Sequence, residues 1–235
     1  MGVLYNSRIV TDGLVLCLDA GDRMSYPGAG TTWYDLGKSK YHGTLTNGPT
    51  FVSDEGKSYF QFDGANDRVD FDYLQPAYQT TTDFTWCVWF WYNGSINNNI
   101  IIGNRNNSAG NDSPRVFDKL TPTKFEYYST MFGPNVVLNQ WQQVIIVKNQ
   151  TNLFYYRNGE LQASTTSSVT KSQTHPFFIA GDAAAGEYAN VRVNSCQIYD
   201  IPFSAEQVKQ QYKATKGRFG LWYILMENYY NGNII

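Results

Sequence analysis

The chain is an almost unbroken series of short apolar and aromatic segments of strand length, closed by one helical segment near the C-terminus. The most apolar segment, residues 84–92, has the sequence FTWCVWFWY and is apolar on both of its alternating faces. A strand with two apolar faces is typical of the centre of a layered β-structure. The helical segment begins after Ser204, whose capping-box partner is Gln207, and we expect its C-terminal cap at Gly217. This pattern predicts an all-β, two-sheet antiparallel sandwich with one short C-terminal helix.

Composition and charge narrow the classes of partner. Only 16% of the 235 residues are charged, against a usual value of about 25%, whereas 16% are aromatic. The net charge of −2 gives no electrostatic reason to expect nucleic acid as a partner. No apolar run approaches the roughly 20 residues of a membrane-spanning helix, so we expect no membrane insertion.

The chain shows no linker and no break in composition. We therefore expect one sandwich domain over residues 1–220 and a short extension over residues 221–235. The N-terminus lacks the apolar core of a signal peptide. Cys17, Cys87 and Cys196 each lie within an apolar segment without a metal or disulfide spacing, which predicts buried free thiols. These features favour synthesis in a reducing cytoplasm.

Several short motifs together resemble a known family. They are GLVLCLDAG (13–21), YPG (26–28), TWYDL (32–36), GTLTNGP (43–49), FDGAND (62–67), YRNG (156–159), FSAE (203–206) and KGRFG (216–220). This set resembles the laminin-G-like, concanavalin A-like lectin/glucanase jelly-roll domains of the type found in structural proteins of tailed phages. The resemblance implies a jelly-roll sandwich with a binding or architectural role.

The function implied by the resemblance is that of a non-enzymatic virion structural protein, as a capsid decoration or a tail or fibre component. It would be made in the host cytoplasm, would assemble with other virion proteins and with copies of itself, and would attach to a cell-surface glycan as an added role. One alternative is a free-standing carbohydrate-binding, lectin-like module. The other is a glycoside hydrolase, which the sequence disfavours because the Glu-x-Asp-x-x-Glu arrangement of the related glucanases is absent.

Sugar binding requires an exposed aromatic platform with amide or charged groups beside it. The chemistry is available at Tyr26, Tyr34 and Asp35 in one loop-rich segment, and at Asn98, Asn104 and Arg105 in an Asn-rich one; these six residues are the predicted ligand site. Trp33 lies in the first segment but is favoured as a core residue, and we expect Trp86 and Trp141 in the core.

A calcium site is the metal hypothesis, since some laminin-G-like domains hold calcium through loop oxygens. The oxygen-bearing side chains available are Asp63, Asn66, Asp67 and Asp112. The alternative, which we favour, is that the first three stabilise a hairpin turn through side-chain to backbone hydrogen bonds. No other cofactor is expected.

The extension over residues 221–235 is longer than the sandwich requires. Its apolar and aromatic side chains form the predicted assembly segment, which contains Trp222, Tyr223, Ile224, Leu225, Tyr229 and Tyr230. One interpretation is an added edge strand of the domain itself. The other, slightly favoured, is docking to a neighbouring subunit by β-augmentation.

Overall fold

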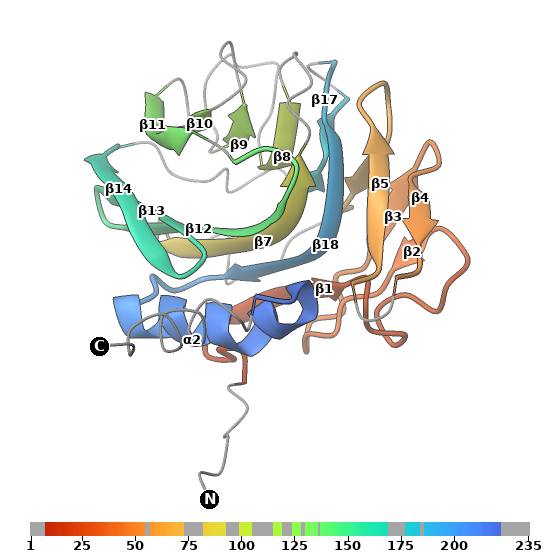
Figure 1. Ribbon diagram of the computed structural model, residues 1–235, viewed down its shortest axis with the longest axis horizontal. Coiled ribbons are helices and arrows are strands. Elements are labelled where there is room, and N and C mark those ends of the chain that lie inside the picture. The colour runs from red at the N-terminus through yellow and green to blue at the C-terminus, as the bar shows by residue number, and fades with distance from the viewer. Residues whose placement is uncertain are drawn as a thin grey trace, which may run out of the picture.

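A computed structural model describes residues 8–54, 57–72, 82–92, 99–104, 115–118, 124–127, 130–135, 137–168, 177–183 and 186–221. Two eight-stranded antiparallel sheets face each other and confirm the predicted sandwich (Figure 1). Sheet A contains, in spatial order, β14 (Glu160–Thr166), β13 (Asn152–Arg157), β12 (Trp141–Asn149), β7 (Phe84–Tyr92), β18 (Asn190–Tyr199), β5 (Tyr59–Asp63) and β4 (Thr50–Val52), with β1 (Leu14–Asp19) also paired to β18.

Sheet B contains β11 (Thr130–Asn135), β10 (Lys124–Tyr127), β9 (Arg115–Asp118), β8 (Asn99–Gly103), β15 (Phe178–Ile179), β6 (Arg68–Asp70), β3 (Gly43–Thr46) and β2 (Thr32–Trp33), in that order. A small ribbon of β16 (Gly181–Asp182) and β17 (Glu187–Tyr188) completes the strands of the described residues. Within those residues, no helix is long and apolar enough to cross a bilayer.

Strand β7 lies at the centre of sheet A, between β12 and β18, as its two apolar faces predict. One face, with Phe84, Trp86 and Phe90, is buried between the two sheets. The opposite face, with Cys87 and Trp89, is buried beneath the C-terminal helix and the turn that follows it. The chain therefore needs apolar side chains at successive positions here, not alternation with polar ones.

Helix α2 (Ala205–Thr215) covers the outer face of sheet A, on the side away from sheet B (Figure 1). The predicted capping box is confirmed, because Ser204 Oγ accepts from Gln207 N and Gln207 Oε1 accepts from Ser204 N. The C-terminal end differs from expectation: the 3₁₀ turn η2 (Lys216–Phe219) continues the chain through Gly217. It is Gly220, at φ 70°, that takes the left-handed conformation.

The tryptophans divide between the core and the outer face. Trp33 and Trp86 are buried between the sheets, which confirms the expectation for both. Trp141 is different: it is the first residue of β12 and lies half-buried on the outer face of sheet A, where its ring is 5.0 Å from that of Phe219. The prediction of a core position for Trp141 was wrong, because its alternation along the strand points it away from sheet B.

Sheet A is split along one edge of β18. β7 pairs along one edge, between Val191 and Tyr199, so β5 and β1 share the other edge. β5 pairs with residues 190–193 and β1 with residues 195–199. Asn194 lies at the junction, in a bulge. Its backbone oxygen accepts from Ala20 N at 2.8 Å and its amide Nδ2 donates to Ser58 O at 2.7 Å. The segments that follow β1 and precede β5 are thereby held side by side.

The cysteine prediction is confirmed for all three residues. Cys17, Cys87 and Cys196 are buried and free. Burial is the largest cause that raises the pKa of each thiol, to about 12 for Cys17. They pack as small apolar residues and hold no disulfide.

Candidate binding groove

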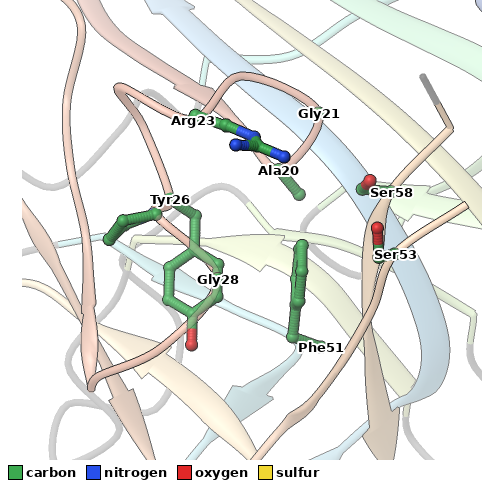
Figure 2. Close-up of a pocket in the computed structure, with 9 residues that line it drawn as sticks. Ala20, Gly21, Arg23, Tyr26, Gly28, Phe51, Ser53 and Ser58 are labelled. Carbon is green, nitrogen blue, oxygen red and sulfur yellow. The ribbon is translucent and has the colours of Figure 1, made fainter. Parts of the chain in front are cut away.

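An open groove of about 630 Å³ lies where sheet A is split. Its lining comes from the loop after β1 and from the segment that runs through β4 to the start of β5 (Figure 2). The lining residues are Ala20, Gly21, Arg23, Tyr26, Pro27, Gly28, Phe51, Ser53 and Ser58. Two chain segments that are about thirty residues apart in sequence are thus brought together by their common neighbour β18.

The floor of the groove is aromatic. The ring centroids of Tyr26 and Phe51 are 4.8 Å apart, and both rings pack on Phe60 in the core, at 4.8 and 5.5 Å. Tyr26 is only 6% exposed, and its hydroxyl donates to Gly30 O at 2.9 Å. Burial raises the pKa of Tyr26, so its hydroxyl stays protonated in neutral solution. The floor is rigid because each ring is packed against the core.

The loop after β1 is held in place by Ser25, which is fully buried. Its hydroxyl donates to Tyr34 O at 2.6 Å and accepts from Asp19 N at 3.0 Å. Its backbone oxygen accepts from Tyr34 N at 2.7 Å. Small size and a hydroxyl that both donates and accepts explain why serine suits this position. The rim of the groove is therefore fixed relative to β1 and to the strand that contains Trp33.

The polar groups of the groove are one guanidinium and two hydroxyls. Arg23 is exposed, and its side chain forms no hydrogen bond or ion pair with any residue that the structure describes. Figure 2 shows it on the rim near Ala20, with Ser53 and Ser58 on the opposite wall. Ser58 Oγ accepts from Asp54 N at 3.4 Å, which leaves its hydroxyl hydrogen free to donate. An aromatic floor with donors on both walls suits a polyhydroxylated ligand.

Of the six predicted ligand residues, the groove contains Tyr26. Tyr34 is 40% exposed and meets the His42 ring edge-on at 5.1 Å, outside the groove lining. Asp35 is 2% exposed, and its carboxylate accepts from three backbone N–H groups, those of Cys17, Gly37 and Tyr41. The structure gives Asp35 a role in the framework that joins β1 to the following loop.

Of the second predicted cluster, the structure describes Asn104 alone, and Asn104 does not line the groove. Asn104 is fully buried after β8. Asn98 and Arg105 lie outside the described residues, as do all six residues of the predicted assembly segment: Trp222, Tyr223, Ile224, Leu225, Tyr229 and Tyr230.

The predicted calcium residues form a tight turn between β5 and β6. Asp63 Oδ1 accepts from the backbone N–H groups of Ala65, Asn66 and Asp67, at 2.8, 3.3 and 3.5 Å. These bonds lower the pKa of Asp63, and the bond from Ala65 contributes most. Burial raises the pKa of Asp67. No cluster of three or more acidic, His or Cys side chains suited to a metal occurs in the described part of the chain, and Asp112 lies outside it. The carboxylates thus stabilise the turn, as the favoured interpretation expects, and calcium binding stays the competing hypothesis.

Sequence reasoning missed eight of the nine lining residues, among them Arg23, Phe51, Ser53 and Ser58. Each lies in or beside a segment of turn-forming residues, which indicates loops but not which loops meet. These residues come together because β1 and β5 pair with the same edge of β18. Period-2 patterns identify strands without giving their order in a sheet.

Comparison with known proteins gives one sequence family. The sequence profile of the concanavalin A-like lectin/glucanases superfamily matches residues 54–209. No curated protein matches the chain.

Several solved structures have a similar fold. Trypanosoma rangeli sialidase in complex with sialic acid matches 88% of this chain and 33% of its own, with a TM-score of 0.64 and 14% identity. The botulinum neurotoxin serotype D binding domain matches 87% of this chain and 52% of its own (TM-score 0.62, 15% identity). The binding domain of Botulinum Neurotoxin DC in complex with SialylT matches 88% and 52% (TM-score 0.62, 12% identity). The chain spans a third to a half of these chains, and identities this low show the fold alone.

Proposed function

Because the chain belongs to the concanavalin A-like lectin/glucanases superfamily, we propose that it is a non-enzymatic carbohydrate-binding protein whose glycan site is the groove between the loop after β1 and the start of β5. The observation that carries the proposal is a rigid aromatic floor, Tyr26 and Phe51, beside the guanidinium of Arg23 on the rim, which has no hydrogen-bond or ion-pair partner among the described residues. Two of the structural neighbours are in complex with sialic acid and with SialylT, which supports sialylated glycans as the first ligands to test.

The groove provides two kinds of contact to a sugar. Phe51 is half-buried, so the accessible part of its ring can pack against the C–H groups of a pyranose. Ser53 and Ser58 can exchange hydrogen bonds with sugar hydroxyls from one wall, while Arg23 donates from the other. A charged donor contributes more than a neutral one, so Arg23 is expected to carry the largest single polar contribution.

The test is a titration of the purified protein with the best glycan found on an array. Arg23→Gln is expected to weaken the affinity about tenfold or more, and Ser58→Ala by a smaller factor. Lys213→Gln, at an exposed position of α2, removes the same charge far from the groove and serves as the matched control. Undiminished binding by the Arg23→Gln, Ser58→Ala double variant would contradict the assignment of the groove.

The non-enzymatic part of the proposal rests on the sequence. The glucanase Glu-x-Asp-x-x-Glu arrangement places two carboxylates on one strand face at about 5–5.5 Å, and this chain has no such triplet. We expect bound glycan to be recovered intact after prolonged incubation. Release of a monosaccharide in proportion to protein concentration would make the protein a hydrolase.

A second proposal is that the protein is a structural component of a tailed-phage virion, supported by the resemblance and in particular by the KGRFG ending. In this ending Phe219 stacks on Trp89 at 4.1 Å and Arg218 pairs with Asp19, so it fastens the turn after α2 to sheet A. The proposal predicts a homo-oligomer in light scattering, which deletion of residues 221–235 would disperse. A full-length monomer that does not associate with particles would contradict it.

A further inference from the structure

Four side chains form a row across the outer face of sheet A, beyond the end of α2. Strand register places Trp141 of β12 opposite Trp91 of β7, Trp91 opposite Arg192 of β18, and Arg192 opposite Gln61 of β5. With strands about 4.8 Å apart, the row is about 14 Å long. All four side chains are half-buried, so they form a partly accessible strip on this face.

Arg192 is the charged member of the row and is held from several sides. Its guanidinium carbon lies 4.0 Å from the centroid of the Trp91 ring and 5.3 Å from that of Tyr59. Its Nε donates to Gln61 Oε1 at 2.9 Å, and Gln61 Nε2 in turn donates to Asn190 Oδ1 at 3.2 Å. The orientation of the guanidinium plane is therefore fixed before any ligand arrives.

The two terminal nitrogens of Arg192 have no acceptor among the described residues, and no carboxylate there forms an ion pair with it. Two other arginines differ from it: Arg218 is paired with Asp19, and Arg23 is exposed and stacks on no aromatic ring of the described part of the chain. A planar guanidinium with a free pair of N–H groups matches the two oxygens of a carboxylate.

We propose that this row is a second ligand site, distinct from the groove, which binds the carboxylate of an acidic sugar on Arg192. The sugar ring lies on the aromatic side chains beside it, Tyr59 and Trp141, whose rings meet edge-on at 5.5 Å. Aromatic side chains flanking a cation favour a sugar acid over an acidic peptide, because the pyranose presents a flat array of C–H groups to the rings. This site does not depend on the groove for its chemistry.

The test compares sialyllactose with lactose, which differ by one acidic sugar. Binding is followed by titration calorimetry and by the fluorescence of the tryptophans, two of which lie in the row. The wild-type protein is expected to prefer sialyllactose about tenfold or more, with a preference that weakens as salt is added. Arg192→Gln should abolish the preference, and Arg192→Lys should retain part of it, since the charge remains without the planar fork.

The matched control is Lys213→Gln, which removes a positive charge from an exposed position of α2 and should leave the preference for sialyllactose intact. Arg23→Gln is measured beside it, because it reports on the groove. If Arg23→Gln abolishes the preference and Arg192→Gln does not, the second site is refuted and the groove is the glycan site. A wild-type protein that binds both sugars equally, or that binds an acidic peptide and not sialyllactose, also overturns the proposal. Unfolding temperatures of all variants establish that a loss is not due to misfolding, and Arg192→Lys decides the matter if Arg192→Gln fails to fold.

Discussion

Asp35 offers the sharpest test of how the groove is supported, since its carboxylate was a predicted ligand group and the structure uses it internally. Its Oδ1 accepts from Cys17 N at 2.8 Å and from Gly37 N at 2.7 Å, and its Oδ2 accepts from Tyr41 N at 3.0 Å. Replacement by Ala leaves three N–H donors without an acceptor. At about 1–2 kcal/mol for each, with water relieving the outermost, Asp35→Ala should destabilise the fold by about 3–5 kcal/mol.

The Asp35→Asn variant distinguishes the contributions of the two carboxylate oxygens to stability. The Asn carbonyl can still accept from Cys17 and Gly37, while its NH₂ group faces the N–H of Tyr41, so the expected loss is about 1–2 kcal/mol. Urea denaturation gives both values from the shift in midpoint at constant slope. Asp72→Ala removes an exposed aspartate and should change stability by less than about 0.5 kcal/mol.

A result within 1 kcal/mol of wild type for Asp35→Ala would refute this reasoning. Glycan binding supplies the second readout. If Asp35 supports the loop without touching ligand, Asp35→Asn should bind glycan with nearly wild-type affinity. A stable Asp35→Asn protein that has lost binding would restore the original assignment of Asp35 as a ligand group.

Four further predictions follow from the same contacts. Trp86→Ala should cost about 3–5 kcal/mol and Trp141→Ala about half of that; equal costs would contradict the outer-face position of Trp141. Because burial raises the pKa of Cys17 to about 12, a thiol reagent at pH 8 should label none of the three cysteines until the protein unfolds, and stability should fall as pH rises from about 9 to 12. Ser204→Ala should destabilise by about 1 kcal/mol through loss of the capping box, measured against an exposed control such as Lys213→Ala. Millimolar calcium should leave the melting temperature of chelator-treated protein unchanged, since Asp63 already accepts backbone bonds; a rise would establish the calcium site.

Much of the sandwich was predictable because a strand that is buried on both faces has a recognisable, almost wholly apolar sequence. Strand β7 has apolar side chains on both faces, with Thr85 as its one polar residue, and α2 is bounded by a capping box that needs only Ser204 and Gln207. Trp141 was misplaced because its size favours the core while its face depends on the register of β12 against β7. The end of α2 was misplaced because a 3₁₀ turn carries the chain past Gly217 to Gly220.

The sites were less predictable, because each is built from residues that meet only through strand order. Tyr26 was found from its loop and its chemistry, but Arg23 and Ser58 face each other only because β1 and β5 share one edge of β18. The acidic and amide side chains that looked available, Asp35 and Asn104, are buried. Polar residues in loops have two competing uses, and the sequence alone does not separate backbone capping from ligand contact.

The most direct test of carbohydrate binding is a glycan-array screen of wild-type protein beside Arg23→Gln, run with calcium and again with chelator. We predict saturable binding by the wild type, equal with and without chelator and weakened in Arg23→Gln. A blank array in both conditions would contradict carbohydrate binding and would leave an architectural role as the better explanation of this fold.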